Sequence, residues 1–393
     1  MTQRREFLTS AAAASAVLAL RPGLAEATQG VSKNEIVLGS IQDLSGPIVA
    51  LGKNVQNGMI LRTEQINAAG GINGRKIKLV IEDAGYDPKK GVLAAQKLLS
   101  NDKAFAMIAT MGTAVSLPTI SLCIEKGVPH LFPITAHKGN YEPFHKLKFA
   151  TFAPYTDTVA SGLKELVRLK GYKRVAILYQ DDEFGMDVLR GAEQALKALN
   201  MQLVEKTTYK RGATEFGSQL QRLRAANPDL IVLGTIIRET IGAMATGRQL
   251  GYTGDFFGSS AAYMPAVARA GGKAVEGLYA MSEAPTPYRD NPGNSKLLND
   301  WMDAYKGRFN DDPDLYSVIG YLLLDMFAKA AEKAGPNLTV ESFVKSLETN
   351  PYPRSFLGTP DYAFGPNLRL GNVQSRINQI QNGRWQGVSD FLK

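Results

Sequence analysis

Short apolar segments alternate with longer segments of helical periodicity along the first half of the chain, and this alternation is the strongest constraint on its fold. A continuous apolar run is typical of a strand buried on both faces, as in a parallel sheet covered by helices. The segments between the runs are long enough for the crossovers that parallel strands require. The pattern therefore predicts an α/β unit with strands at residues 35–41, 76–82, 108–110 and 130–133.

The alternation stops at an extended, proline-containing segment, residues 149–154, and then starts again. Further strands are predicted at residues 174–179, 201–209, 230–234 and 256–260, with helices between them. Two more extended segments, 278–287 and 358–364, lie nearer the C-terminus, which itself reads as strands. Three extended crossings between two α/β units predict two lobes and a cleft that closes on a ligand.

This division gives each lobe two pieces of the chain. We assign residues 28–153 and 285–355 to the first lobe, and residues 154–284 and 356–393 to the second. No sequence repeat relates the two units.

Residues 1–27 are typical of a twin-arginine signal peptide. Arg4 and Arg5 are followed by Phe-Leu, an alanine-rich stretch at 11–20 and a small-x-small cleavage site at 25–27. The apolar stretch is too short to span a bilayer. We expect export to the periplasm by the twin-arginine route, and an uncleaved amphipathic N-terminus is the alternative.

Composition and motifs favour binding without chemistry. The formal net charge is +8, but the basic residues are scattered without aromatic interleaving, which argues against a nucleic-acid partner. The motifs of phosphate loops, dinucleotide sites, serine hydrolases and zinc proteases are missing from the sequence. His130, His137 and His145 lack metal-ligand spacing, and Cys123 has no partner for an internal disulfide. We therefore predict no enzyme activity, no metal and no cofactor.

The stretch from residue 111 to 137 contains two polar turns that follow neighbouring strands. The first turn precedes a short helix, and the second ends the next strand. Backbone N–H groups, hydroxyls and a helix N-terminus at the carboxyl edge of a sheet form a cradle for a small anion. Two ordinary βα loops are the alternative interpretation.

The chain resembles the substrate-binding proteins of branched-chain amino acid-type ABC transporters, the leucine/isoleucine/valine-binding protein family. The resemblance covers most of the mature chain and is carried by the segments 36–39, 44–47, 66–74, 82–88, 127–133 and 179–185. It implies the type I periplasmic binding fold, with two Rossmann-like lobes built on parallel sheets and joined by three hinge crossings. It also implies closure on a small solute and docking on an inner-membrane permease, and we expect a monomer.

The resemblance also implies a set of site residues. The family holds a ligand carboxylate with hydroxyl and backbone groups of the two polar turns, at the positions that correspond here to Thr113, Ser116, Ile134, Thr135 and Ala136. A stacking aromatic residue corresponds to Phe184, and an apolar residue near the first turn corresponds to Leu51.

The departures from the family pattern concern the ligand's amino group. Tyr155 and Ser260 stand where the family has acidic residues that pair an ammonium, and a family aromatic is replaced by Ile236 with Arg238 nearby. Leaving a buried ammonium unpaired costs several kcal/mol, whereas an arginine in the cleft favours a carboxylate.

We therefore predict a carboxylate ligand with an apolar or aromatic body and no α-amino group, such as an aromatic acid or a branched oxo acid. Asp157 or Glu283 could instead pair an ammonium, in which case the ligand is a branched-chain amino acid. The sequence is also compatible with a ligand-sensing module, or with a cleft enzyme that uses the carboxylates at 181–183. We expect those carboxylates to be solvated or to cap a helix.

Overall fold

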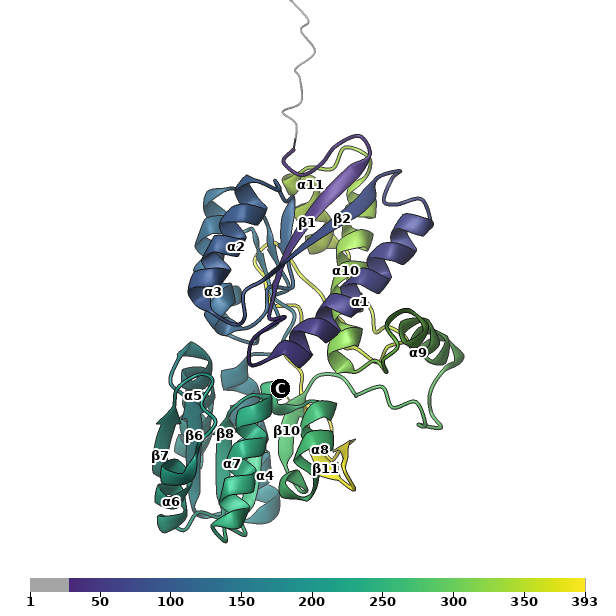
Figure 1. The fold of residues 1–393 in the computed structure, drawn as a ribbon. Coiled ribbons are helices and arrows are strands. Elements are labelled where there is room, and N and C mark those ends of the chain that lie inside the picture. The colour runs from purple at the N-terminus through teal and green to yellow at the C-terminus, as the bar shows by residue number, and fades with distance from the viewer. Residues whose placement is uncertain (1–27, 393) are drawn as a thin grey trace, which may run out of the picture.

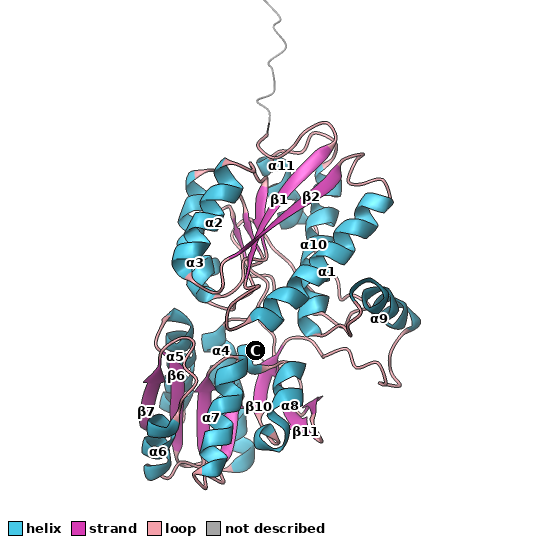
Figure 2. Cartoon of the chain, in the orientation of Figure 1, coloured by secondary structure: helices cyan, strands magenta, loops and turns pink. Residues whose placement is uncertain are grey.

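The computed structural model describes residues 28–392, and the signal peptide predicted for residues 1–27 lies outside them. Two lobes, each a sheet with helices on both faces, lie one above the other and are joined by extended segments (Figure 1). This is the predicted two-lobed α/β fold. Strands lie inside each lobe and helices outside (Figure 2).

The first lobe contains, within the described residues, a five-stranded parallel sheet with the order β2-β1-β3-β4-β5. Because helices cover both faces, Ile36, Leu38 and Ile41 of its first strand have no exposed surface. The strands and connecting helices are β1 (Glu35–Gln42), α1 (Val49–Ala68), β2 (Lys76–Asp83), α2 (Pro88–Ser100), β3 (Ala106–Ile108), α3 (Thr113–Glu125), β4 (His130–Leu131), η1 (Lys138–Asn140) and β5 (Lys148–Phe149).

The second lobe contains, in the same described range, a seven-stranded sheet with the order β12-β11-β10-β9-β8-β6-β7. Its elements are α4 (Tyr155–Lys170), β6 (Val175–Gln180), α5 (Glu183–Ala198), β7 (Leu203–Tyr209), α6 (Gly217–Ala225), β8 (Leu230–Gly234), α7 (Ile237–Gln249), β9 (Asp255–Gly258), η2 (Ser260–Ala262), α8 (Pro265–Gly271), η3 (Gly272–Val275), β10 (Tyr279–Ser282), β11 (Arg376–Gln381) and β12 (Arg384–Gly387).

The core of this second sheet, from β7 to β10, is parallel as expected, and the last two strands make the sheet mixed. β11 and β12 pair antiparallel with each other, and β11 pairs antiparallel with β10. Asn382 and Gly383 form the turn between them, both at positive φ. An Asn-Gly turn of this kind favours a two-residue β-hairpin. Because β11 and β12 are antiparallel, this short turn joins them without a crossover helix.

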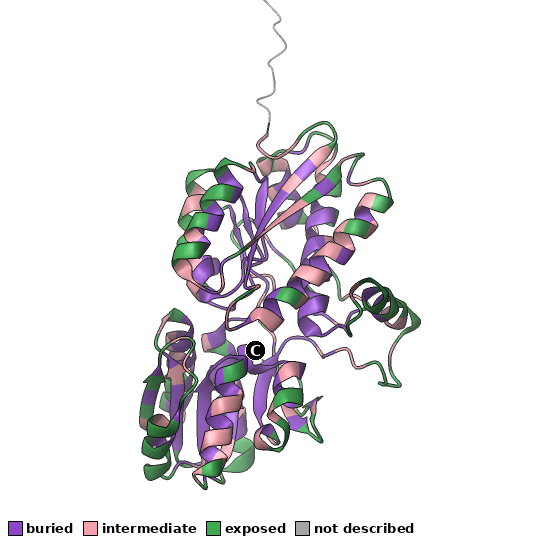
Figure 3. Cartoon of the chain, in the orientation of Figure 1, coloured by how far each residue is buried: buried purple, intermediate pink, exposed green. Residues whose placement is uncertain are grey.

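Three helices follow the second crossing: α9 (Lys296–Phe309), α10 (Leu315–Ala334) and α11 (Val340–Thr349). α10 packs along α1 of the first lobe, although the two helices lie far apart in the sequence. Glycines allow this close approach. A Cβ on Gly58 of α1 would lie 2.1 Å from the carbonyl oxygen of Ser317, and a Cβ on Gly320 of α10 would lie 2.1 Å from the carbonyl oxygen of Val55. Figure 3 shows α10 buried over most of its length.

The third crossing makes contacts with the first lobe before it reaches the second. Leu370 pairs with Ala150, and the Phe364 ring packs against Phe132 and Phe149. The lobe boundaries stay a prediction, and these contacts favour moving the boundary at residue 356 to about Asn372.

Candidate functional site

The strand orders create a topological switch point in each lobe. In the first sheet the crevice lies between β1 and β3, and in the second it lies between β6 and β8. Open α/β sheets bind ligands outside the carboxyl ends of the strands at such points. The two crevices lie on the facing sides of the lobes, near the crossings (Figure 1).

A small pocket, called here the cleft pocket, lies between these two carboxyl edges. Its cavity volume is about 30 Å³, which is room for one or two water molecules. A larger solute therefore requires movement of side chains or of the lobes. The first lobe contributes Ile48, Leu51, Tyr86, Met111, Gly112, Thr113, Ile134, Thr135 and Tyr316, and the remaining lining residues are Phe152, Tyr155, Phe184, Ile236, Ser260 and Ala261.

Two threonine hydroxyls form the polar end of the cleft pocket. Thr113 Oγ1 and Thr135 Oγ1 lie 2.6 Å apart, and both side chains are buried. Each hydroxyl carries one hydrogen, so one donates to the other and the second hydrogen is left for a further acceptor. Thr113 is the first residue of α3, where backbone N–H groups carry partial positive charge. This end of the pocket suits a small anion.

Gly112 brings an aromatic ring against the start of α3. Its backbone has φ 80° and ψ 150°, a conformation that glycine adopts without steric cost. A Cβ at this position would lie 2.3 Å from Cε2 of Tyr86. The Tyr86 ring therefore covers the polar end of the pocket from the β2–α2 loop.

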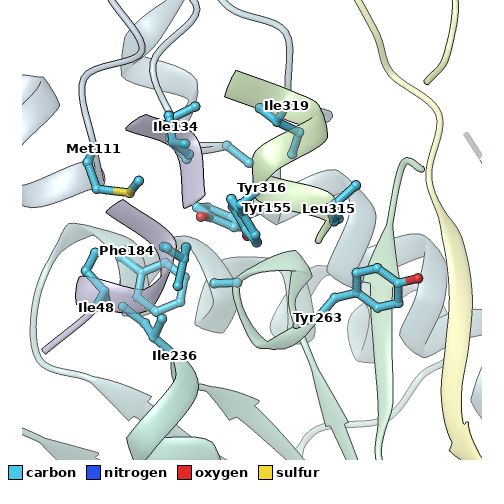
Figure 4. Close-up of a cluster of buried hydrophobic side chains, with 14 of the residues drawn as sticks. Ile48, Met111, Ile134, Tyr155, Phe184, Ile236, Tyr263, Leu315, Tyr316 and Ile319 are labelled. Carbon is cyan, nitrogen blue, oxygen red and sulfur yellow. The ribbon is translucent and has the colours of Figure 1, made fainter. Parts of the chain in front are cut away.

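Aromatic and aliphatic side chains form the rest of the lining. Tyr155 and Phe184 meet edge to face, with ring centroids 5.0 Å apart. Figure 4 shows the Phe184 ring beside Ile236, and Tyr316 beside Tyr155. Burial raises the pKa of Tyr155 to about 12 despite hydrogen bonds to Thr135 and Ala136, so its hydroxyl stays neutral. These residues suit an apolar or planar ligand body.

No charged side chain of the described residues lines the cleft pocket. Tyr155 and Ser260, at the positions where the resemblance implies carboxylates, both line it. An ammonium bound here would meet hydroxyl groups and aromatic rings but no formal negative charge.

The structure brings eight of the predicted site residues together in this lining: Leu51, Thr113, Ile134, Thr135, Tyr155, Phe184, Ile236 and Ser260. Two others are buried close by without lining it. Ser116 Oγ donates to Asn140 Oδ1 at 2.7 Å, and the Ala136 carbonyl accepts from the Tyr155 N–H at 3.0 Å.

Arg238 does not lie in the cleft pocket, so the structure does not support the arginine part of the carboxylate hypothesis. It is exposed at the start of α7, between the buried residues Ile237 and Glu239. Successive helix positions are rotated by about 100°, so Arg238, two positions after the lining residue Ile236, lies on another side of the helix and points to solvent.

Sequence reasoning missed Tyr86, Phe152 and Tyr316. Tyr86 follows Gly85 in a loop where both residues have positive φ, and Phe152 lies in the first crossing. Tyr316 is the second residue of α10, after the N-cap Asp314. A cap at Asp314 is visible in the sequence, but nothing in the sequence indicates that this helix end reaches the cleft.

The carboxylates that the sequence offered for the site serve other contacts. Asp182 caps α5 by accepting from the N–H groups of Phe184 and Gly185, as expected. Asp157 lies in the first turn of α4 outside the pocket lining. Glu283 is buried beside the pocket and accepts from the Ala153 N–H at 2.7 Å. Burial raises its pKa to about 8, so its carboxyl is largely protonated at neutral pH.

Arg211 of the second lobe bridges the cleft. Its guanidinium lies 4.9 Å from the centroid of the Tyr86 ring in the first lobe and donates to the Tyr86 carbonyl at 3.3 Å. Asp182 holds the same guanidinium by a 2.8 Å ion pair. The contacts with Tyr86 exist only when the lobes are together, so they favour the closed arrangement.

We expect Arg211→Ala to shift the equilibrium toward separated lobes by about tenfold. The partly exposed cation–π contact and hydrogen bond contribute about 1–1.5 kcal/mol together. Single-molecule distance measurements between α2 and α6 would report the shift. Arg222→Ala is the matched control, because Arg222 pairs with Glu205 inside the second lobe. Equal distance distributions for the two variants would contradict this role of Arg211.

The described residues contain no group of three or more His, Cys, Asp or Glu side chains arranged to hold a metal ion. Among them there is also no helix of the length and apolarity needed to cross a membrane. Cys123 is buried, and burial raises its thiol pKa to about 12.

Comparisons with known proteins agree with the geometry. A family described as periplasmic binding protein matches residues 35–384. The Leu/Ile/Val-binding protein homolog 2 of Brucella abortus is 26% identical over 329 residues, covering 82% of this chain and 85% of that protein.

Two solved structures share the fold. A fatty acid ABC transporter substrate-binding protein from Thermomonospora curvata has a TM-score of 0.82 at 24% identity, covering 93% of this chain and 94% of its own. A solute binding protein of an R. palustris ABC transporter, in complex with benzoate, has a TM-score of 0.79 at 16% identity, covering 90% and 96%. The family match spans most of the chain, and the chain therefore belongs to the periplasmic binding protein family, the non-enzymatic solute receptors of ABC transporters.

Proposed function

We propose that this solute-binding protein takes up a small monocarboxylate with an apolar or aromatic body and no α-amino group. The cleft pocket would close on this acid and deliver it to an inner-membrane permease. Aromatic acids and branched oxo acids are the ligand classes that fit.

The observation that carries the proposal is the charge pattern of the cleft pocket. Its polar end has the Thr113–Thr135 hydroxyl pair at the start of α3, and no carboxylate of the described residues lines it. Hydroxyl and N–H donors stabilise a carboxylate. A desolvated ammonium without a charged partner would lose several kcal/mol.

A branched-chain amino acid is the second candidate, because the Brucella relative is called a Leu/Ile/Val-binding protein homolog. In that case the ammonium would need a partner, and Glu283 is a buried carboxyl in the adjoining space, which shares Phe152 and Ser260 with the cleft pocket. A ligand-sensing module would use the same cleft, and a missing permease gene beside this one would favour it.

The test is a binding screen on refolded residues 28–393, because refolding removes any solute carried through purification. Benzoate, cinnamate and the oxo acid of leucine are compared with leucine, isoleucine and valine by thermal shift and calorimetry. A ligand that binds only the folded state raises the melting temperature. We expect shifts with the acids alone. Leucine binding that Glu283→Ala abolishes would overturn the proposal.

Export by the twin-arginine route and a monomeric state stay predictions. The motif that carries the first lies at Arg4 and Arg5, outside the described residues.

A further inference from the structure

A second buried space, called here the hinge chamber, adjoins the cleft pocket. All three crossings line it, through residues 151–152, residues 282–284, and Thr359 with Tyr362, and α10 forms most of its remaining wall. Phe152, Ser260 and Tyr316 line both spaces. The two spaces therefore share a wall, and a ligand that reaches both requires the Phe152 or Tyr316 ring to move.

The hinge chamber is apolar along one side and polar at the other. α10 contributes Leu315, Ile319, Leu322 and Leu323, all buried. Figure 4 shows Leu315 and Ile319 on the side of Tyr316 away from Met111. The crossings contribute Thr151 and Glu283. The cavity volume is about 20 Å³, which is room for one water molecule. After a movement of side chains or lobes, this arrangement suits an apolar group that ends in a hydrogen-bonding group.

Thr151 is the observation that points to a ligand. Its side chain is 2% exposed, and its Oγ1 has no hydrogen-bond partner among the described residues. A buried hydroxyl without a partner costs free energy, so buried hydroxyls are normally paired. The unpaired hydroxyl lines the hinge chamber, where a group on a bound molecule could pair with it.

Glu283 makes this polar end neutral. Its carboxyl accepts from the Ala153 N–H and is bonded by the Asn372 side chain. Because burial raises its pKa to about 8, the carboxyl holds a proton at neutral pH and repels no anionic ligand. The protonated Glu283 carboxyl also offers an O–H donor. A charged group at the distal end of the ligand would meet no opposite charge in the hinge chamber.

We propose that the hinge chamber is a second subsite, which binds the distal end of an elongated acid that carries a neutral hydroxyl group. The carboxylate lies at Thr113 and Thr135, the body passes Tyr316, and the hydroxyl pairs with Thr151. This inference rests on the proposed function, because it places the acid's carboxylate in the cleft pocket.

The test compares three probes on the refolded protein by calorimetry: benzoate, cinnamate and para-hydroxycinnamate. Benzoate is the shortest of the three acids and is expected to occupy the cleft pocket alone. We expect para-hydroxycinnamate to bind about tenfold tighter than cinnamate, the size of one buried hydrogen bond. Thr151→Val should remove that difference and leave benzoate and cinnamate unchanged.

Two further variants make the result specific. Leu323→Phe narrows the chamber and should weaken both cinnamates about tenfold while sparing benzoate. Thr207→Val is the matched control, because Thr207 Oγ1 is also buried and unpaired within the described residues but lies on β7. Melting curves confirm that each variant is folded.

The outcomes separate the two proposals. If benzoate binds, and the affinities of both cinnamates are the same for Thr151→Val and Leu323→Phe as for the unchanged protein, the second subsite alone is overturned. Equal affinity of cinnamate and para-hydroxycinnamate for the unchanged protein would also overturn it. If no acid binds, the proposed function fails and the second subsite falls with it.

Discussion

Replacing both Thr113 and Thr135 by valine is expected to weaken binding of a carboxylate ligand by about 100-fold. A hydrogen bond to a charged group contributes about 1.5–3 kcal/mol. The two hydroxyls lie at the anion end of the cleft pocket, so their joint loss leaves the Tyr155 hydroxyl and the backbone N–H groups of α3 as the remaining donors there. Calorimetry with the tightest acid of the screen measures the loss.

The same double variant should keep its stability. The two hydroxyls lie 2.6 Å apart and satisfy each other, and replacing both partners by apolar groups of the same shape is nearly neutral. Thr135→Val leaves the buried Thr113 hydroxyl unpaired, whereas in Thr113→Val the Thr135 hydroxyl still accepts from the His137 N–H at 3.4 Å, so Thr135→Val should unfold more easily than Thr113→Val. This order of stabilities separates loss of ligand contacts from loss of folding.

Thr119→Val is the matched control for ligand binding. Thr119 is a buried threonine of the same helix, and its hydroxyl donates to the Ser116 carbonyl at 2.8 Å, away from the cleft pocket. Unchanged acid binding is expected for this variant. An acid that binds the double variant as tightly as the unchanged protein would show that Thr113 and Thr135 do not hold the carboxylate.

Glu283→Gln is expected to stabilise the protein near pH 8 and to change little near pH 5. The folded-state pKa of Glu283 is raised by burial from 4.5 to about 8. Between these two values the unfolded chain binds fewer protons than the folded one, so the free energy of unfolding falls as pH rises. One pKa unit corresponds to about 1.4 kcal/mol, so the expected gain near pH 8 is a few kcal/mol.

Urea unfolding at several pH values measures this difference. Glutamine keeps an oxygen that accepts from the Ala153 N–H, so the variant removes the titration without removing that contact. Glu125→Gln on the exposed end of α3 is the control. Parallel stability profiles for Glu283→Gln and the unchanged protein would mean that the Glu283 carboxyl titrates alike in both states.

The sequence predicted the fold because a parallel strand that is buried on both faces appears as a short, continuous apolar run. β8 occupies residues 230–234, where the strand was predicted, and all five of its residues are buried. Crossover helices and crossings followed from the spacing of such runs. The strands β11 and β12 were predicted, but their antiparallel direction was not. That direction depends on pairing with β10, which is far away in the sequence.

The candidate site could be predicted only where its residues follow strand ends. Thr113, Thr135 and Phe184 occupy βα turns, whose place in a parallel sheet is fixed by topology. Tyr316 reaches the cleft only because α10 packs on α1, which is a tertiary contact. Arg238 was predicted in the cleft because it lies two positions after Ile236, but closeness in sequence to a lining residue does not fix the direction of a side chain at a helix start.

The late return of α10 to the first lobe also bears on when the protein can fold during synthesis. The groove of α1 that Gly58 lines is filled by Ser317 and Tyr321, which a ribosome adds long after α1 itself. Most of the polypeptide must therefore be finished before the N-terminal lobe has its own complete core. Such a chain completes its fold late in translation or after it. The predicted twin-arginine route carries folded proteins, so it would require folding to be finished before export.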